Sequence, residues 1–398
     1  MSSTRGRRVL GGLVLAGFGA GLALLALEGG VRLLHLVPDR FWRPDPVLGT
    51  ALIPNASGWW TQEEYEFVVP VQINADGRRD LDRDVEKPAG SYRVLLLGDS
   101  FVEALQVPIA DTFARGLERR LGEAGQRPVE VISMGVSGYG TASQYLWYRD
   151  VGRRYRPDLV LLSFYPGNDV RNNSPTLEPT LRPVYGTDGA LERVVGGKGG
   201  ENSGRSGLNR SAAYTYVRKL ILTRQPALAT RLAEWGLVGE AALRQVPLRD
   251  GVPVDYWVYA QDPPPAWQDA WAHTDRLLTA FREAVQADGA RFVVMVVTAR
   301  EQIYPDDWQQ VLRTYPDMQA LAWDVGGPER RVLDWCARSG AECVALSPAF
   351  LAARDRSPRL HWHHDGHWTA AGHALAAETM TEILRPAVRP PAQYAEGQ

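Results

Sequence analysis

An apolar run that ends abruptly in a glycine and two polar residues constrains the fold of this chain most strongly. Val94–Leu97 is followed directly by Gly98, Asp99 and Ser100. Such a run is typical of a buried parallel strand that ends in a tight turn into a helix. Ser100 is therefore expected in the crevice above the carboxyl ends of the strands, where open α/β sheets bind ligands. Because serine is a poor nucleophile without a base, a catalytic role requires a base elsewhere in the chain.

Strand and helix patterns alternate from Ser91 onward, which predicts a doubly wound α/β fold with a mainly parallel sheet between two layers of helices. The expected strands are Arg93–Leu97, Val129–Ser133, Asp158–Phe164, Arg291–Val297 and Glu342–Leu346. The expected helices are Asp111–Glu123, capped by Asp111 or Thr112, and Ser143–Tyr155, Ala270–Ala287, Arg330–Arg338 and Ala370–Leu384.

The segment from about 171 to 263 interrupts this alternation and reads as an insertion. Its glycine-rich part, residues 196–207, has the composition of a mobile loop, and helices are expected over Ala212–Leu222 and Leu228–Leu237. An insertion that leaves the sheet after the third strand would lie beside the crevice and shape substrate access. The alternative is a peripheral excursion without a catalytic role.

The amino end predicts the compartment. Arg5, Arg7 and Arg8 precede an uncharged run from Val9 to Leu27, close to the roughly 20 residues that cross a bilayer. We expect residues 1–8 in the cytoplasm, a single-pass inner-membrane anchor over 9–27, and the rest of the chain on the periplasmic side. A cleaved signal peptide is the alternative, although no clean A-x-A cleavage site follows the apolar run.

Composition limits the other partners. The chain has 398 residues, 45% of them hydrophobic, and a formal net charge of −2, which gives no reason to expect a nucleic-acid partner.

Residues 36–90, rich in proline and tryptophan, are expected to form a juxtamembrane segment packed on the main domain, and residues 387–398 a flexible tail. Trp59 and Trp60 are assigned to packing, with a membrane interface or a sugar site as alternatives. Cys336 and Cys343 would either pair in an oxidising compartment or stay as two buried thiols.

Candidate bases are few, because five of the seven histidines lie in the stretch 361–373. Imidazoles and a carboxylate are good zinc ligands, so this stretch could hold a metal. Alternatively, it presents one catalytic histidine with an acidic neighbour. The stretch lacks the fixed spacing of a zinc motif, so we expect no metal and no cofactor.

Four short blocks, each after an expected strand or before an expected helix, resemble the SGNH/GDSL hydrolase superfamily. The blocks are Gly98–Phe101, Gly135–Gly138, Gly167–Asp169 and Asp365–Thr369 with Gly372. The resemblance runs from Ser91 to about Arg385, excluding the insertion. It implies the flavodoxin-like three-layer α/β/α fold of that superfamily, in a domain spanning residues 91–386.

The resemblance also implies site residues. Ser100 would be the nucleophile, His367 the base, and Asp365 the acid that orients the imidazole. The oxyanion hole would comprise the backbone N–H groups of Ser100 and Gly138 and the side-chain amide of Asn168. A glycine lets the backbone approach a substrate closely, and an amide donates without carrying charge.

Three positions depart from the family pattern. The acid usually stands three residues before the histidine, where this chain has His364, and Asp365 stands only two before. This D-x-H-W version resembles that of extracytoplasmic polysaccharide O-acetylation proteins. Ser133 replaces a usual asparagine, and the glycine that would complete G-x-S-x-G is missing, which disfavours the α/β-hydrolase elbow. Asp99 is assigned a structural role, and Ser100 alone would read as a helix cap.

The expected activity is that of a serine-dependent ester hydrolase that works through an acyl-enzyme. The D-x-H-W block favours acetyl esters of a cell-envelope carbohydrate as substrates. The alternatives are an O-acyltransferase to an extracytoplasmic polysaccharide using the same site, a lipid esterase or lysophospholipase, and a catalytically silent glycan-binding domain.

Overall fold

The computed structural model describes residues 3–62, 64–125, 127–178, 182–185, 191–194, 211–225, 228, 231–232 and 248–388. The chain divides into two compact units. The smaller comprises residues 1–39, 59–68 and 202–245, and the larger comprises residues 40–58, 69–201 and 246–398. The glycine-rich stretch 196–207, most of the helix expected over Leu228–Leu237, and residues 389–398 of the expected tail lie outside the described residues.

A five-stranded sheet forms the centre of the larger unit, and every neighbouring pair in it is parallel. Its strand order, β13-β12-β7-β5-β6, is the flavodoxin-like order 2-1-3-4-5. This confirms the predicted fold class, and every predicted strand is present to within two residues. The strands are β5 (Tyr92–Gly98), β6 (Val129–Gly135), β7 (Leu159–Phe164), β12 (Arg291–Val296) and β13 (Glu342–Ala345).

The register aligns the carboxyl ends of the strands. Gly98 of β5 lies opposite Gly135 of β6, and Phe164 of β7 lies opposite Val296 of β12. The turns that follow β5, β6 and β7 therefore emerge at one edge of the sheet. These turns carry three of the four sequence blocks.

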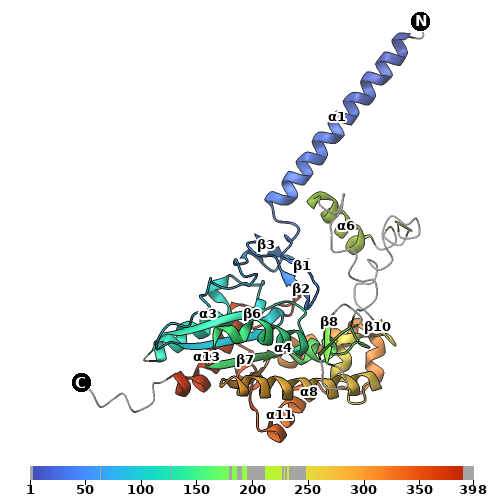
Figure 1. The fold of residues 1–398 in the computed structure, drawn as a ribbon. Coiled ribbons are helices and arrows are strands. Elements are labelled where there is room, and N and C mark those ends of the chain that lie inside the picture. Colours follow the sequence, from blue (N-terminus) through green and yellow to red (C-terminus); the bar gives the residue numbers. More distant parts are fainter. Residues whose placement is uncertain are drawn as a thin grey trace. The chain divides into compact units, whose positions relative to one another are not determined.

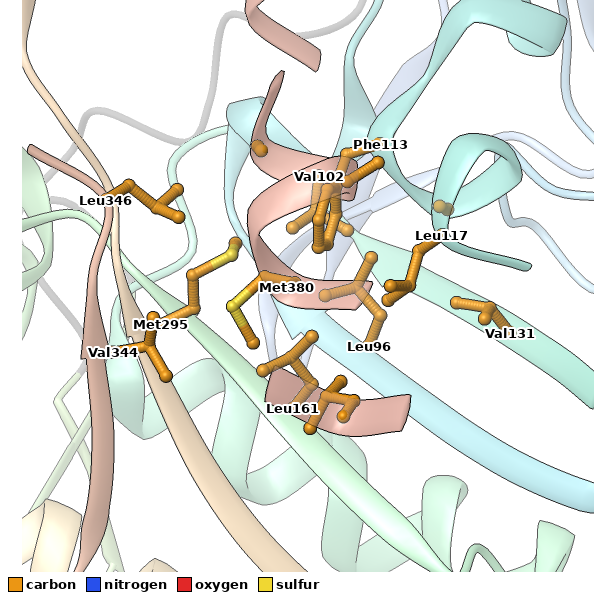
Figure 2. Close-up of a cluster of buried hydrophobic side chains, with 14 of the residues drawn as sticks. Leu96, Val102, Phe113, Leu117, Val131, Leu161, Met295, Val344, Leu346 and Met380 are labelled. Carbon is orange, nitrogen blue, oxygen red and sulfur yellow. The ribbon is translucent and has the colours of Figure 1, made fainter. Parts of the chain in front are cut away.

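Helices cover both faces of the sheet (Figure 1). Figure 2 shows one apolar layer, in which Leu96, Leu161 and Met295 of three neighbouring strands meet Met380 and Phe113 of the covering helices. Burial of such side chains is the main favourable term in folding, at about 25 cal/mol per Å² of apolar surface. The main helices are α3 (Phe113–Ala124) and α13 (Ala370–Val388) on this face, α4 (Thr141–Asp150) and α8 (Pro265–Ala287) on the other, and α11 (Gly327–Ser339).

Several helix ends differ from prediction, and α8 begins at Pro265, five residues before the expected start. Residues 143–155 were expected as one helix, but α4 ends at Asp150 and a 3₁₀ turn, Gly152–Tyr155, follows. A Cβ at Gly152 would lie 2.7 Å from Leu95 Cδ2, so the chain needs a glycine where it passes the sheet. The last helix runs through Pro386 to Val388, beyond the expected domain end. As expected, the hydroxyl of Thr112 caps α3.

Shorter elements complete the larger unit. An antiparallel hairpin of β1 and β2 precedes the sheet, and the insertion returns to the sheet through η5, a 3₁₀ helix. These elements are β1 (Trp42–Asp45), β2 (Gly49–Leu52), α2 (Ser100–Glu103), η1 (Ile109–Asp111), α5 (Pro166–Asn172), β8 (Arg182–Tyr185), β9 (Leu191–Val194), β10 (Leu248–Arg249), β11 (Val252–Pro253), η5 (Val254–Tyr259), α9 (Arg300–Ile303), α10 (Pro305–Thr314), η6 (Pro316–Ala320) and α12 (Ser347–Ala353). Two further strands, β3 (Ser57–Thr61) and β4 (Val68–Gln72), each have residues in both units.

The smaller unit contains α1 (Ser3–Leu33) and α6 (Ala212–Arg224). Within α1, Leu10–Leu33 is long and apolar enough to cross a membrane, a property that signal sequences share. Glu28 of α1 accepts hydrogen bonds from the first residues of α6, at 2.8 Å from the backbone nitrogen of Ala213. Trp59 stacks on His35 within the smaller unit, with ring centroids 4.1 Å apart.

Cys336 and Cys343 form a disulfide, an outcome that the sequence left open. Cys336 lies in the last turn of α11 and Cys343 in β13, with Cα atoms 6.2 Å apart. Gly340, with φ of +68°, ends the helix in the left-handed conformation and turns the chain into the strand. This tight turn brings the two cysteines within bonding range.

Candidate active site

Ser100 begins α2, directly after β5 and its cap residue Asp99. The carboxylate of Asp99 accepts the backbone N–H of Phe101 at 2.9 Å and so caps the short helix. The serine hydroxyl is therefore not needed as a cap, and it is directed to a neighbouring histidine. A Cβ at Gly98 would clash with Val102, which explains the glycine at the end of β5.

The loop between α12 and α13 brings His367 to Ser100, from 267 positions along the chain. His367 Nε2 lies 2.7 Å from Ser100 Oγ, and His367 Nδ1 lies 2.7 Å from Asp365 Oδ1. Because a carboxylate only accepts, Nδ1 carries the proton, and Nε2 of a neutral ring accepts the serine proton. Gly366, with φ of +84°, provides the turn between acid and histidine. The three side chains thus form a continuous hydrogen-bonded relay.

The relay shifts the pKa values of both titratable members. Burial lowers the pKa of His367, but the charge of Asp365 and its hydrogen bond outweigh burial, so the net pKa is raised. Burial acts to raise the pKa of Asp365, but the charge of His367 and its hydrogen bonds outweigh it, and that pKa is lowered. The pair therefore favours an ionised acid beside a histidine that accepts a proton readily.

This pairing predicts the pH dependence. Only a neutral His367 can accept the serine proton, so kcat/KM should rise with pH through a pKa above the ordinary histidine value of about 6.5. The measurement is a profile of kcat/KM against pH, from 5 to 9, with a small ester. An acidic limb centred below the ordinary value would contradict the assignment of His367 as the base.

Asn168 reaches the same place from α5, which follows β7. Its Nδ2 donates to Asp99 Oδ2 at 2.8 Å, while its Oδ1 is buried and has no hydrogen-bond partner among the described residues. An amide nitrogen carries two N–H groups, so one is bound to Asp99 and the other remains for a ligand. Burial raises the pKa of Asp99, and the hydrogen bonds from Phe101 and Asn168 oppose that rise. The sequence analysis assigned Asp99 contacts with the local backbone only, and it did not predict the contact with Asn168.

Loss of this amide should slow the reaction without weakening binding. Asn168→Ala is expected to lower kcat on the order of 10²–10³, as for other single oxyanion donors, and to leave KM nearly unchanged. Steady-state kinetics with p-nitrophenyl acetate, beside a thermal unfolding curve, measures both. An increase in KM at constant kcat would place Asn168 in ground-state binding instead.

Gly138 lies in the turn after β6, with φ of +79°. Asn172 Nδ2 donates to its carbonyl at 3.1 Å. The neighbouring Ser137 donates its backbone N–H to Glu103 Oε2 at 2.7 Å, and its hydroxyl donates to the same oxygen. Burial raises the pKa of Glu103 to about 7, against the opposing effect of the Ser137 hydrogen bonds. The sequence did not single out Glu103, although a glutamate directly after Phe101 and Val102 is a signal for a buried polar contact.

One cavity of about 370 Å³ joins four of the expected site residues: Ser100, Asn168, Asp365 and His367 all line it. Gly138 is not among the lining residues. The insertion contributes to the wall of this cavity through η5, so this part of the insertion lies beside the expected site residues. The other lining residues are Phe101, Tyr165, Gly167, Pro253, Asp255, Tyr256, Tyr259, Arg300, Glu301, Tyr315 and Gly366.

The remaining histidines of the stretch are structural or lie apart from the relay. His361 is buried, with Nε2 at 3.2 Å from both the hydroxyl and the carbonyl oxygen of Thr298. His373 Nδ1 accepts the backbone N–H of Phe113 at the start of α3. Within the part of the chain that the structure describes, no cluster of three metal-ligating side chains is present.

Comparison with protein families gives one match. The model of the GDSL-like lipase/acylhydrolase family matches residues 96–375, a range that includes all five expected site residues. No curated protein matches the chain.

Solved structures of low sequence identity also resemble this chain. TesA is 12% identical, with a TM-score of 0.37 over 74% of this chain and 98% of that chain. Axe2, an acetylxylan esterase from Geobacillus stearothermophilus, is 13% identical, with a TM-score of 0.36 over 74% and 95%. LAE5, an α/β hydrolase enzyme from the metagenome of Lake Arreo, Spain, is 11% identical, with a TM-score of 0.37 over 75% and 97%.

Proposed function

Because this chain belongs to the GDSL-like lipase/acylhydrolase family and is a serine esterase, we propose that Ser100, His367 and Asp365 form its catalytic triad. The observation that carries the proposal is the relay of two 2.7 Å contacts from serine to histidine to aspartate. Serine and histidine within hydrogen-bond reach, with the histidine oriented by a third group, are the requirement for an activated serine nucleophile.

The reaction proceeds in two halves. Ser100 Oγ attacks the ester carbonyl carbon while His367 Nε2 takes the hydroxyl proton. The negative oxygen of the tetrahedral intermediate is held by the N–H groups of Ser100 and Gly138 and by Asn168 Nδ2. The intermediate then collapses, the leaving alcohol takes the proton from His367, and the acyl group stays on Ser100. A water molecule then attacks the acyl carbon while His367 takes its proton, and the bond to Ser100 Oγ breaks as His367 returns that proton to Oγ, which releases the acid and restores Ser100.

The proposed substrates are acetyl esters of a cell-envelope carbohydrate. The wall that faces the triad combines the rings of Tyr165, Tyr256 and Tyr259 with the charged groups Asp255 and Glu301. Tyrosine offers a flat apolar face and a polar hydroxyl, which suits a sugar ring with its hydroxyl groups. A long acyl chain would instead require a continuous apolar channel.

A panel of esters tests this assignment. The expected order of kcat/KM is acetyl above butyryl and palmitoyl among p-nitrophenyl esters, with acetylated oligosaccharides turned over as well. Intact mass spectrometry of acid-stopped reactions should show one acetyl group on the protein, located on Ser100. A preference for palmitoyl esters would favour the lipid esterase alternative.

Acyl transfer is the second candidate, favoured by the D-x-H-W block of residues 365–368. Both reactions share the acyl-enzyme and differ only in the acceptor that attacks it. Incubation with an acetyl donor and oligosaccharide acceptors separates them. Free acetate as the sole product indicates hydrolysis, and acetylated oligosaccharide indicates transfer.

We place the triad outside the cytoplasm, on a single-pass inner-membrane anchor. The three arginines before the apolar part of α1 favour a cytoplasmic amino end. The disulfide between Cys336 and Cys343 suits an oxidising compartment. Retention in the membrane after alkaline extraction, together with protease sensitivity from the periplasmic side, is the expected result.

A further inference from the structure

The segment before the family match contacts the turns of the active site. The family model begins at residue 96, and the hairpin of β1 and β2 lies wholly before it. Trp42 of β1 donates its indole N–H to Glu103 Oε1 at 2.9 Å. On the other side of the same carboxylate, Oε2 accepts the backbone N–H of Ser137 at 2.7 Å. One buried carboxylate thus joins the hairpin to the residue before Gly138.

A second contact joins the hairpin to the same turn. The hydroxyl of Tyr139 donates to the backbone carbonyl of Thr50, in β2, at 2.7 Å. The hairpin therefore holds the residues on both sides of Gly138, one through Glu103 and the other directly. Tyr139 and Glu103 are each about 1% exposed, and their partners Trp42, Thr50 and Ser137 are half-buried, which limits the access of water to these hydrogen bonds.

A third set of contacts, made by Arg79, holds the carboxyl end of α2. Arg79 is buried and donates to the carbonyl of Glu103 at 2.9 Å, to that of Val107, and to that of Ala104, which has a positive φ of +53°. These bonds fix the exit of α2, the helix that begins with Ser100. The positive charge of Arg79 also acts to lower the pKa of Glu103, which reduces the cost of burying that carboxylate.

From these contacts we infer that the hairpin of β1 and β2, together with Arg79, is a brace of the oxyanion hole, with Trp42, Glu103 and Tyr139 as positioning residues for the Gly138 N–H. This inference rests on the proposed function, because it assigns a purpose to contacts around that site. A glycine turn with a positive φ is intrinsically adaptable, so its N–H keeps a fixed direction only if its neighbours are held. An oxyanion donor must be aimed before the charge develops, and a loose donor costs rate and not ground-state binding.

Three conservative variants and two matched controls test the brace in the full-length protein. The variants are Trp42→Phe, Glu103→Gln and Tyr139→Phe. Each control removes a hydrogen bond from the same type of side chain elsewhere: Trp335→Phe, which loses a bond to Thr279, and Tyr148→Phe, which loses a bond to Asp288. The readouts are kcat and KM for p-nitrophenyl acetate and the midpoint of thermal unfolding.

We expect kcat to fall on the order of tenfold for Trp42→Phe and Tyr139→Phe, and on the order of 10² for Glu103→Gln, with KM nearly unchanged. The controls keep the kcat of the wild-type protein. Since Trp42 acts through Glu103, the double variant of these two should be no slower than Glu103→Gln alone. If Glu103→Gln fails to fold, Trp42→Phe and Tyr139→Phe, which each remove one hydrogen bond, still test the brace.

The brace is overturned if Trp42→Phe and Tyr139→Phe match their controls in kcat and Glu103→Gln matches the wild-type protein, or if the three variants lose activity only through KM. Ser100→Ala, assayed in parallel, separates this outcome from failure of the proposed function. An active wild-type protein, an inactive Ser100→Ala protein and unaffected brace variants would reject the brace and leave the triad intact. Undiminished activity in Ser100→Ala would reject the triad itself.

Discussion

Replacement of Ser100 by alanine is expected to reduce kcat for p-nitrophenyl acetate by roughly 10⁵–10⁶, to the rate that the oxyanion donors alone support. The physical reason is that no acyl-enzyme forms without the Oγ that lies 2.7 Å from His367 Nε2. The assay is steady-state hydrolysis, with fluorophosphonate labelling as an independent readout of the nucleophile. Both signals should disappear together.

The protein should remain folded, because the Ser100 hydroxyl does not cap α2 and Asp99 does. The free energy of unfolding is expected to change by less than about 0.5 kcal/mol. Ser91→Ala is a matched control at the opposite end of β5, where the hydroxyl donates to the carbonyl of Pro88 at 2.8 Å. Retention of fluorophosphonate labelling in Ser100→Ala would identify another nucleophile and reject the assignment.

The parallel sheet and three of its site turns were predictable because they depend on local patterns. An apolar run such as Val94–Leu97, followed by a glycine that marks a turn, is typical of a strand buried on both faces. The blocks at Ser100, Asn168 and His367 follow or precede such elements, so the fold class determines the edge at which they meet. The structure brings these three residues to one cavity.

The contacts that hold the site were not predictable, because they join segments far apart in sequence. Trp42 and Glu103 are 61 positions apart, and Asp99 and Asn168 are 69 apart. No spacing rule connects such pairs, and a buried carboxylate looks the same in sequence as an exposed one. The aromatic run of η5 in the insertion was a usable signal for a cavity wall, since tyrosines such as Tyr256 and Tyr259 rarely cluster in a peripheral loop.

The acid of the triad was the least certain assignment from sequence, because the usual position of the acid holds His364. In the structure, Asp365 reaches His367 Nδ1 at 2.7 Å from only two residues away, and Gly366 with its positive φ makes this short span possible. His364 is exposed and belongs to the wall of a neighbouring cavity. Geometry therefore favours Asp365 as the orienting acid.

Replacement of Asp365 by asparagine is expected to lower kcat on the order of 10⁴, as for other triads that lose the acid without losing its shape. An amide cannot stabilise the imidazolium, and its N–H₂ group favours the tautomer with the proton on Nε2, which cannot accept from Ser100. His364→Ala is the matched control and should keep nearly the full kcat.

The same variant also makes a prediction about pH that a purely structural role for Asp365 does not share. The charge of Asp365 and its hydrogen bond raise the pKa of His367, whereas burial lowers it. Once the acid is neutral, burial dominates, so the acidic limb of kcat/KM should move to lower pH while the plateau falls. If the plateau of kcat/KM falls but the pKa of its acidic limb stays unchanged, the base that titrates in the profile is not the histidine that Asp365 holds.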